Sequence, residues 1–272
     1  MSSTLNRHPN KPPRPLVPGM YAPLPTFYLD NDEQDLGEFP EPHPVIRIAR
    51  RWCSRTIFQC CGVIIDIPTL KKHVVFLANA GVGLVLAGTM GEGIHLSHSD
   101  RVTLVTAARE ALDNAGFTDM PIIVGTGAGS THETVQLSKE VAEAGADYVI
   151  VIIPGYFAGL LASNKEAVKT FFTEVAEKSP IPVIIYNCGF ILGGCGPNQG
   201  AEDSILDPGA TGGIDLDSDL ILEIAEEAPN TVGVKLTYAE FTGDSQGFPG
   251  LTLIVHQVWK RWKVDEDLRD CF

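Results

Sequence analysis

The chain has 272 residues and is 44% hydrophobic, which is enough apolar material for one large domain such as a parallel α/β barrel of about 250 residues. Its 20 Lys and Arg against 34 Asp and Glu leave a formal net charge of −14 at pH 7, which repels nucleic-acid backbones and anionic lipid. Because of this charge we expect no nucleic-acid partner. No apolar run reaches about 18 residues, so we expect no membrane span.

Residues 1–18 are polar and rich in proline, and they contain no apolar core of a signal peptide. This composition predicts a disordered lead to a cytoplasmic protein. The cysteines do not form pairs at zinc-binding spacing, so we expect free thiols. They are Cys53, Cys60, Cys61, Cys188, Cys195 and Cys271.

Short apolar, β-branched runs alternate with helical patterns along residues 19–237. The predicted strands cover residues 19–27, 84–87, 122–124, 149–153, 183–185 and 232–234. The predicted helices cover residues 69–80, 98–115, 131–144, 165–178 and 218–228. This iterated βα unit predicts an all-parallel α/β sheet of the (β/α)8 TIM-barrel type, incomplete and with about six strands.

The run GTGAGS at residues 125–130 follows a predicted strand and raises a doubly wound nucleotide-binding sheet as a rival fold. The third glycine of G-x-G-x-x-G would fall on Ser130, and no acidic residue ends a strand about 20 residues later to bind a ribose. The barrel is therefore the favoured architecture.

Lys235 lies in the predicted strand TVGVKLT, where it shares a face with Gly233, opposite the aliphatic residues. Burying an ammonium is costly, so an edge-strand lysine that reaches solvent is an alternative that this segment leaves open. An amine with a pKa of about 10.4 is almost fully protonated at pH 7, and desolvation would supply more of the neutral nucleophile. Lys235 is therefore our candidate for attack on a substrate carbonyl.

Three hydroxyl residues end or follow predicted strands. Tyr186 ends the fifth strand, Thr89 lies in a glycine-rich segment after the second, and Tyr156 comes shortly after the fourth. Taken singly, each is better explained as an ordinary core or loop residue. Together with Lys235, however, they all lie at the carboxyl ends of strands, where barrel enzymes keep their active sites, so we expect a proton relay there.

The chain resembles the dihydrodipicolinate synthase and N-acetylneuraminate lyase family over residues 19–237, with interruptions. Residues 88–92 (GTMGE) are similar to the family's G-[ST]-x-G-E loop. Residues 186–187 are similar to its Y-N signature, and residues 233–235 to its G-x-K lysine motif.

The resemblance implies a role for each matching residue. Lys235 would form an imine with a 2-keto acid, and Tyr186 and Thr89 would relay protons. The loop of Thr89, Met90 and Gly91 would hold the substrate carboxylate. Met90 stands where several members have a hydroxyl residue, so one carboxylate contact would come from backbone N–H alone.

Tyr156 matches a second relay tyrosine that many members contribute across a tight dimer, which implies a homo-oligomer. The resemblance also implies a class I aldolase that cleaves a 2-keto-3-deoxy acid or a 4-hydroxy-2-oxoglutarate-like substrate to pyruvate and an aldehyde, without cofactors. Family synthases that condense pyruvate with an aldehyde usually carry an arginine shortly after Y-N. None occurs between Asn187 and Lys235, which favours the aldolase.

Three stretches do not fit a regular barrel, because a βα unit spans about 30 residues. Extra sequence lies near residues 38–66 and 189–208, and residues 238–272 are too few for two further units. We therefore expect a catalytic domain at residues 19–237 and a non-family tail at 238–272. Translated intervening sequence and a lost C-terminal region would explain this pattern, so a catalytically inactive, truncated or mis-spliced relative is the alternative function.

His95 and His98 raise a metal-dependent aldolase as a third hypothesis. Their i, i+3 spacing at a predicted helix start, with no obvious carboxylate partner, favours surface histidines instead. We therefore expect no metal site.

Overall fold

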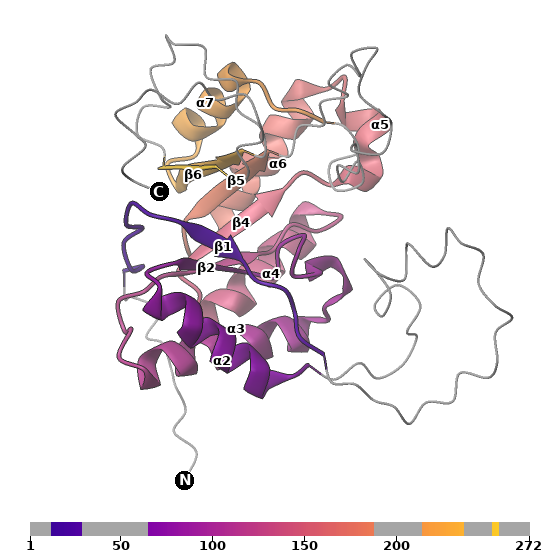
Figure 1. Cartoon of the computed structure of the whole chain (residues 1–272). Coiled ribbons are helices and arrows are strands. Elements are labelled where there is room, and N and C mark those ends of the chain that lie inside the picture. Colours follow the sequence, from indigo (N-terminus) through magenta and orange to yellow (C-terminus); the bar gives the residue numbers. More distant parts are fainter. Residues whose placement is uncertain (1–11, 29–64, 188–213, 237–251, 256–272) are drawn as a thin grey trace, which may run out of the picture.

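The computed structural model describes residues 12–28, 65–187 and 214–236, together with the backbone of residues 252–255. These residues form one parallel sheet whose strands follow sequence order (Figure 1). The strands are β1 (Tyr21–Pro23), β2 (Gly83–Leu86), β3 (Ile122–Gly125), β4 (Tyr148–Ile152), β5 (Val183–Asn187), β6 (Thr231–Leu236) and β7 (Thr252–Val255). The α-helices are α2 (Ile67–Asn79), α3 (His98–Asn114), α4 (Thr131–Ala144), α5 (Ala158–Leu161), α6 (Lys165–Lys178) and α7 (Ser218–Glu227). Two short 3-10 turns are η1 (Gly93–His95) and η2 (Gly155–Phe157).

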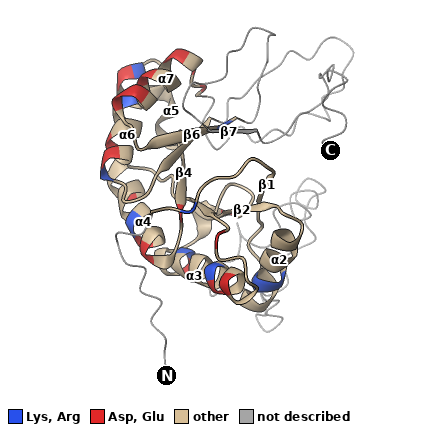
Figure 2. Ribbon diagram, turned by 90° about the vertical axis from the view of Figure 1, so that its left-hand side faces the viewer, with Lys and Arg blue, Asp and Glu red and all other residues tan. Residues whose placement is uncertain are grey.

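The sheet curls, and the helices cover its outer side (Figure 2). β1 and β7 stand at the two ends of the strand order, so the described residues form an open half-barrel. A doubly wound sheet reverses its strand order, whereas this order never reverses. The predicted parallel, incomplete barrel is therefore confirmed.

β7 is a strand beyond the six that the sequence predicted, and it lies within residues 238–272, which remain a non-family tail only as a prediction. Thr252–Val255 pairs in parallel with β6, and Ile254 is the partner of Lys235. This run is apolar and short, and it lies beyond the motifs that guided the prediction. Only the strand pairing reveals it, and the rest of that segment lies outside the described residues.

Side-chain caps and glycines set the ends of the helices. Ser97 begins α3 with a reciprocal capping box to Asp100. Single acceptor side chains cap the other long helices: Asp66, Ser130, Asn164 and Asp217. The glycines that follow α2, α3 and α4 all have positive φ angles: Gly81, Gly116 and Gly145. Within the described residues, no helix is long and apolar enough to cross a bilayer.

Apolar side chains fill both sides of the sheet. The larger cluster lies between strands and helices and includes Val234, and the partly buried Leu236 packs against this cluster. The smaller cluster fills the inside of the curl and consists of Val85, Ile123, Tyr148, Ile150, Ile184 and Tyr186. Because side chains alternate along a strand and Val234 faces the helices, Lys235 faces the inside.

A register shift between β5 and β6 moves one residue away from its predicted face. The shift follows the pair Val183 and Thr231, so Val232 is the extra residue of a β-bulge. Side-chain alternation predicted Val232 on the same face as Val234. In the structure, Val232 packs instead against the inner cluster. Regular pairing resumes beyond the bulge, and Lys235 keeps its predicted face.

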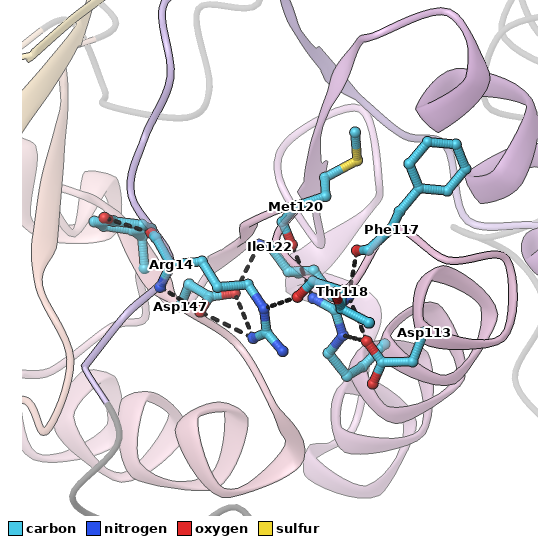
Figure 3. A network of polar contacts seen from close by, with 9 residues as sticks. Arg14, Asp113, Phe117, Thr118, Met120, Ile122 and Asp147 are labelled. Atoms are coloured by element: carbon cyan, nitrogen blue, oxygen red, sulfur yellow. Dashed lines mark hydrogen bonds and ion pairs between the residues drawn. The ribbon is translucent and has the colours of Figure 1, made fainter.

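Residues 12–18 contradict the predicted disordered lead of residues 1–18. The Arg14 backbone N–H and guanidinium bind the Asp147 carboxylate at 3.0 and 3.2 Å (Figure 3). Asp147 is buried and also accepts from the Ile122 N–H at 3.0 Å, so its charge needs a cation nearby. Composition hides this contact because the partner lies 133 positions along the chain. Residues 1–11 lie outside the described residues.

The flanks of both predicted insertions are held together by hydrogen bonds. The Asp66 N–H donates to the Phe27 carbonyl at 2.8 Å, across the first. The Asn187 side chain donates to the Leu216 carbonyl at 2.9 Å and accepts from the Leu216 N–H at 3.1 Å, across the second. The sheet therefore continues past both stretches. The insertion at 189–208, and all of the one at 38–66 except its last two residues, lie outside the described residues.

Candidate active site

Lys235 is a buried lysine inside the curl of the sheet. It is 6% exposed, and its Nζ lies 3.9 Å from the centre of the Tyr186 ring. The two residues are Cα partners on β6 and β5. A ring face attracts an ammonium group by about 0.5–2 kcal/mol, which offsets part of the cost of burial. Because β6 lies between β5 and β7, the alternative of a solvent-reaching edge lysine is wrong.

The two residues of the Y-N pair at the end of β5 face opposite ways. Tyr186 packs in the inner cluster beside Lys235. Asn187 secures the chain that enters α7, through the Leu216 backbone and a hydrogen bond of 2.8 Å to the Asp215 carboxylate. The structure thus brings Lys235 and Tyr186 together, and the proton relay through the tyrosine hydroxyl stays a prediction.

The GTMGE segment leaves β2 through a strained loop. Ala87 and Glu92 have positive φ angles of 50° and 53°. Each such angle costs on the order of 1–3 kcal/mol in a residue that carries a Cβ. The Gly93 N–H donates to the Gly88 carbonyl at 3.0 Å, and the Glu92 N–H donates to the Thr89 carbonyl at 3.1 Å. Strain of this kind persists only where the surrounding structure holds the loop in place.

Thr89 and Met90 are exposed at the tip of this loop, whereas Gly91 is buried. A Cβ on Gly91 would lie 2.8 Å from the Leu24 carbonyl, so the loop packs too closely for any other residue there. Thr89 follows the carboxyl end of β2 and its side chain is exposed, and its contact with a substrate stays a prediction.

Tyr156 lies on η2 just after β4 and is 91% exposed. Its ring packs edge-on against Phe157, with 5.0 Å between ring centres. Leu160 is also exposed nearby on α5. The structure places Tyr156 after the predicted strand end, but on the surface and not in the interior with Lys235.

Two residues that the sequence analysis missed hold the strained loop. Arg101 of α3 is 4% exposed, and its guanidinium donates to the Gly125 carbonyl and, at 2.6 Å, to the Gly93 carbonyl. The Thr26 hydroxyl donates to the Gly91 carbonyl at 2.6 Å. Periodicity was the available signal, because Arg101 shares the buried face of α3 with apolar residues three, four and seven positions later.

The surroundings of the loop combine a buried cation with carboxylates. Burial lowers the pKa of the Arg101 guanidinium, against the opposite effect of Glu133 and Glu140. Burial, followed by the charges of Glu92 and Asp100, raises the pKa of Tyr28 to about 12. Tyr28 therefore stays protonated at neutral pH.

His98 of α3 has two carboxylate partners on α4, whereas the sequence suggested none. Its Nδ1 and Nε2 lie 2.7 Å from carboxylate oxygens of Glu140 and Glu133, both on α4. These hydrogen bonds, that of Glu133 first, raise the pKa of His98. His95 is exposed on η1. The described residues contain no group of three or more His, Cys, Asp or Glu that could hold a metal ion.

A curled parallel sheet in sequence order, with helices covering its outer side, defines the chain as an α/β protein of the TIM-barrel type. More specifically, the chain belongs to the dihydrodipicolinate synthetase family, whose model matches residues 58–195. The match includes the GTMGE loop and the Y-N pair, while Lys235 lies beyond it.

Two fungal relatives match most of the chain. It is 38% identical over 225 residues to the "Probable 4-hydroxy-2-oxoglutarate aldolase, mitochondrial" of Emericella nidulans, covering 82% of this chain and 56% of the relative. It is 38% identical over 226 residues to the L-threo-3-deoxy-hexylosonate aldolase of Aspergillus niger, covering 83% and 52%. The chain thus spans about half the length of the curated relatives it matches.

Solved structures show the same fold. A "putative dihydrodipicolinate synthase family protein" from Coccidioides immitis superimposes with a TM-score of 0.63 at 28% identity, covering 91% of this chain and 63% of that one. The prophage protein YagE of E. coli K12, solved in complex with pyruvate, superimposes with a TM-score of 0.54 at 27% identity, covering 74% and 60%.

Proposed function

We propose that the protein is a class I aldolase that cleaves a 2-keto-3-deoxy acid or a 4-hydroxy-2-oxoglutarate-like substrate to pyruvate and an aldehyde. The observation that carries the proposal is the buried Lys235 against the ring of Tyr186, inside a parallel half-barrel. A buried lysine away from solvent is suited to act as a nucleophile, because its neutral form is the reactive one.

In the proposed reaction, the Lys235 amine attacks the 2-keto carbon, and the carbonyl oxygen leaves as water to give a protonated imine. The C3–C4 bond then breaks, and its electron pair moves into the imine to form an enamine. The 4-hydroxyl loses its proton, through Tyr186 and Thr89, as it becomes the aldehyde carbonyl. A proton adds to C3, and water hydrolyses the imine to release pyruvate.

The loop of Thr89, Met90 and Gly91 would hold the substrate carboxylate. Its glycines allow backbone N–H groups to approach an anion closely, and the Thr89 hydroxyl is exposed beside them. Met90 offers no side-chain hydrogen-bond donor, so the carboxylate would depend on backbone amides and Thr89.

The relatives support the aldolase over the condensing synthase. The two fungal aldolases match more of this chain than does the 4-hydroxy-tetrahydrodipicolinate synthase of Persephonella marina, which is 32% identical over 63% of it. For 4-hydroxy-2-oxoglutarate the aldehyde product would be glyoxylate. Both activities would use the same imine on Lys235. Separate assays of aldol cleavage and of condensation with an aldehyde therefore distinguish them.

Borohydride trapping tests the proposal against the alternative of an inactive relative. Sodium borohydride with pyruvate should reduce the imine and add mass to a peptide that contains Lys235. Folded protein that gains no adduct at saturating pyruvate would establish the inactive relative instead. The open half-barrel of the described residues makes this comparison necessary.

We also propose a homo-oligomer in which Tyr156 contacts a second copy and acts as the second relay tyrosine. The exposed cluster of Tyr156, Phe157 and Leu160 supports this, because three neighbouring large apolar residues are seldom left in water without a partner. A monomer by light scattering contradicts it. Our expectation of a cytoplasmic protein is tested by cell fractionation, since the Emericella nidulans relative is named mitochondrial.

A further inference from the structure

We propose that Arg101, together with Thr26, is a positioning residue that holds the GTMGE loop in the shape required to bind a substrate carboxylate. This inference rests on the proposed function, because it concerns the same loop. Neither residue needs to touch the substrate. Both act on the loop backbone from the side that faces the protein.

Arg101 fixes the base of the loop to the end of β3. Its two Nη atoms donate to the carbonyls of Gly93 and Gly125. The Ala87 carbonyl lies between these glycines, since a Cβ on either one would come within 2.2 Å of that oxygen. The guanidinium fork thus joins the two backbone segments that enclose the start of the loop.

Thr26 fixes the loop from a second direction. Its hydroxyl bonds the Gly91 carbonyl at 2.6 Å, from the segment that follows β1. Gly91 lies between Met90 at the tip and Glu92, which has a positive φ angle. Because Arg101 and Thr26 together hold both ends of residues 91–93, they oppose relaxation of the strain at Glu92.

The positive charge of Arg101 also favours anion binding at the loop. The guanidinium is buried, and it donates to two neutral carbonyls. Its Nε is buried without a hydrogen-bond partner among the described residues. A buried positive charge below the loop favours an anion on the loop's outer side, where the proposed carboxylate would lie.

Arg109 supplies a matched control on the same helix. It is 5% exposed, and its guanidinium also donates to two backbone carbonyls, those of Met120 and Phe117. These residues lie between α3 and β3, at the amino ends of the strands. Arg109 also pairs with Asp113 at 2.7 Å, so Arg109→Met removes at least as many polar contacts as Arg101→Met, but none of them lies beneath the loop.

The test compares two carbonyl compounds and four variants of the full chain: Arg101→Met, Arg101→Lys, Thr26→Val and Arg109→Met. Pyruvate and acetone can both form an imine with Lys235, but only pyruvate has a carboxylate. Borohydride trapping at increasing concentration gives a half-saturating value for each. Hydrogen exchange of a peptide covering residues 88–94 reports the loop without any ligand.

Arg101→Met should raise the half-saturating pyruvate concentration at least about tenfold and leave that for acetone within about twofold. Arg101→Lys should recover part of the loss, because it keeps the charge but not the fork. Thr26→Val, which exchanges a hydroxyl for a methyl group, should show the same selective loss of pyruvate binding. It therefore tests the inference even if Arg101→Met does not fold. Arg109→Met should leave both values unchanged.

Faster exchange of residues 88–94 is expected in Arg101→Met and Thr26→Val, and not in Arg109→Met. An equal loss for pyruvate and acetone, or unchanged exchange in the folded loop variants, overturns the inference. Wild-type protein that traps neither compound refutes the proposed function instead, and the exchange comparison then still decides whether Arg101 and Thr26 hold the loop.

Discussion

The Lys235 Nζ lies 3.9 Å from the centre of the Tyr186 ring, and the two residues face each other across neighbouring parallel strands. This contact separates two properties of the tyrosine. Its ring face stabilises a cation, while its hydroxyl is the group that could move protons. Substitutions can remove either property.

Tyr186→Phe should keep the ring and lose the hydroxyl. We expect the borohydride-trapped imine to persist, while the cleavage rate falls by about 10²–10⁴ because proton transfer is impaired. The measurement is single-turnover cleavage together with intact mass. Tyr148→Phe is the control, since Tyr148 shares the inner cluster but its hydroxyl bonds the Arg14 carbonyl. Equal losses in the two variants would contradict the relay.

Lys235→Met should abolish both trapping and cleavage, with a loss of at least about 10³ in rate, because the nucleophile is removed. Methionine has a similar length and can fill the same space, so the variant should still fold. Urea denaturation and mass spectrometry after borohydride treatment check the two expectations. A pyruvate adduct that remains in the variant assigns the imine to another lysine.

Gly125→Ala should distort the GTMGE loop. Its Cβ would lie 2.1 Å from the Ala87 carbonyl, a backbone atom that cannot move alone. We expect a loss of about 1–3 kcal/mol in stability by denaturation and weaker trapping by pyruvate. Gly129→Ala is the control, because its Cβ would meet nothing within 4 Å. A Gly125→Ala variant as stable as wild type would contradict this packing.

His98 should make stability depend on pH. Its bonds to Glu133 and Glu140 raise its pKa in the folded protein. The stabilisation is fully present below the unfolded value of about 6.5 and is lost as pH rises through the raised folded value. Wild type should therefore exceed His98→Gln in unfolding free energy more at about pH 6 than at about pH 9. A difference that stays constant across this range, in low salt, refutes the linkage.

Arg14→Met should destabilise the fold although residues 1–18 look like a flexible lead. The buried Asp147 carboxylate would lose a charged partner, at a cost of about 1–3 kcal/mol measured by urea denaturation. Asp119→Asn serves as the control and should leave the stability unchanged, because Asp119 is an exposed carboxylate. Equal stability of Arg14→Met and wild type would show that the lead contributes nothing.

The amino-acid sequence by itself determined the parallel α/β class, the order of strands and helices and the inward face of Lys235. These features are local, because alternation of side chains, apolar periodicity, caps and glycine stops act over a few residues. The family motifs added Tyr186 and Thr89 as partners for the lysine. Their proton-relay roles remain predictions.

Only the tertiary structure decided which distant residues meet. The β-bulge that moves Val232 inward and the strand β7 both depend on pairing with a neighbouring strand. Arg14 finds Asp147 133 positions away, and Arg101 binds carbonyls of two different segments. Such contacts follow from how the sheet curls, and no short stretch of sequence encodes the curl, so composition and periodicity could not reveal them.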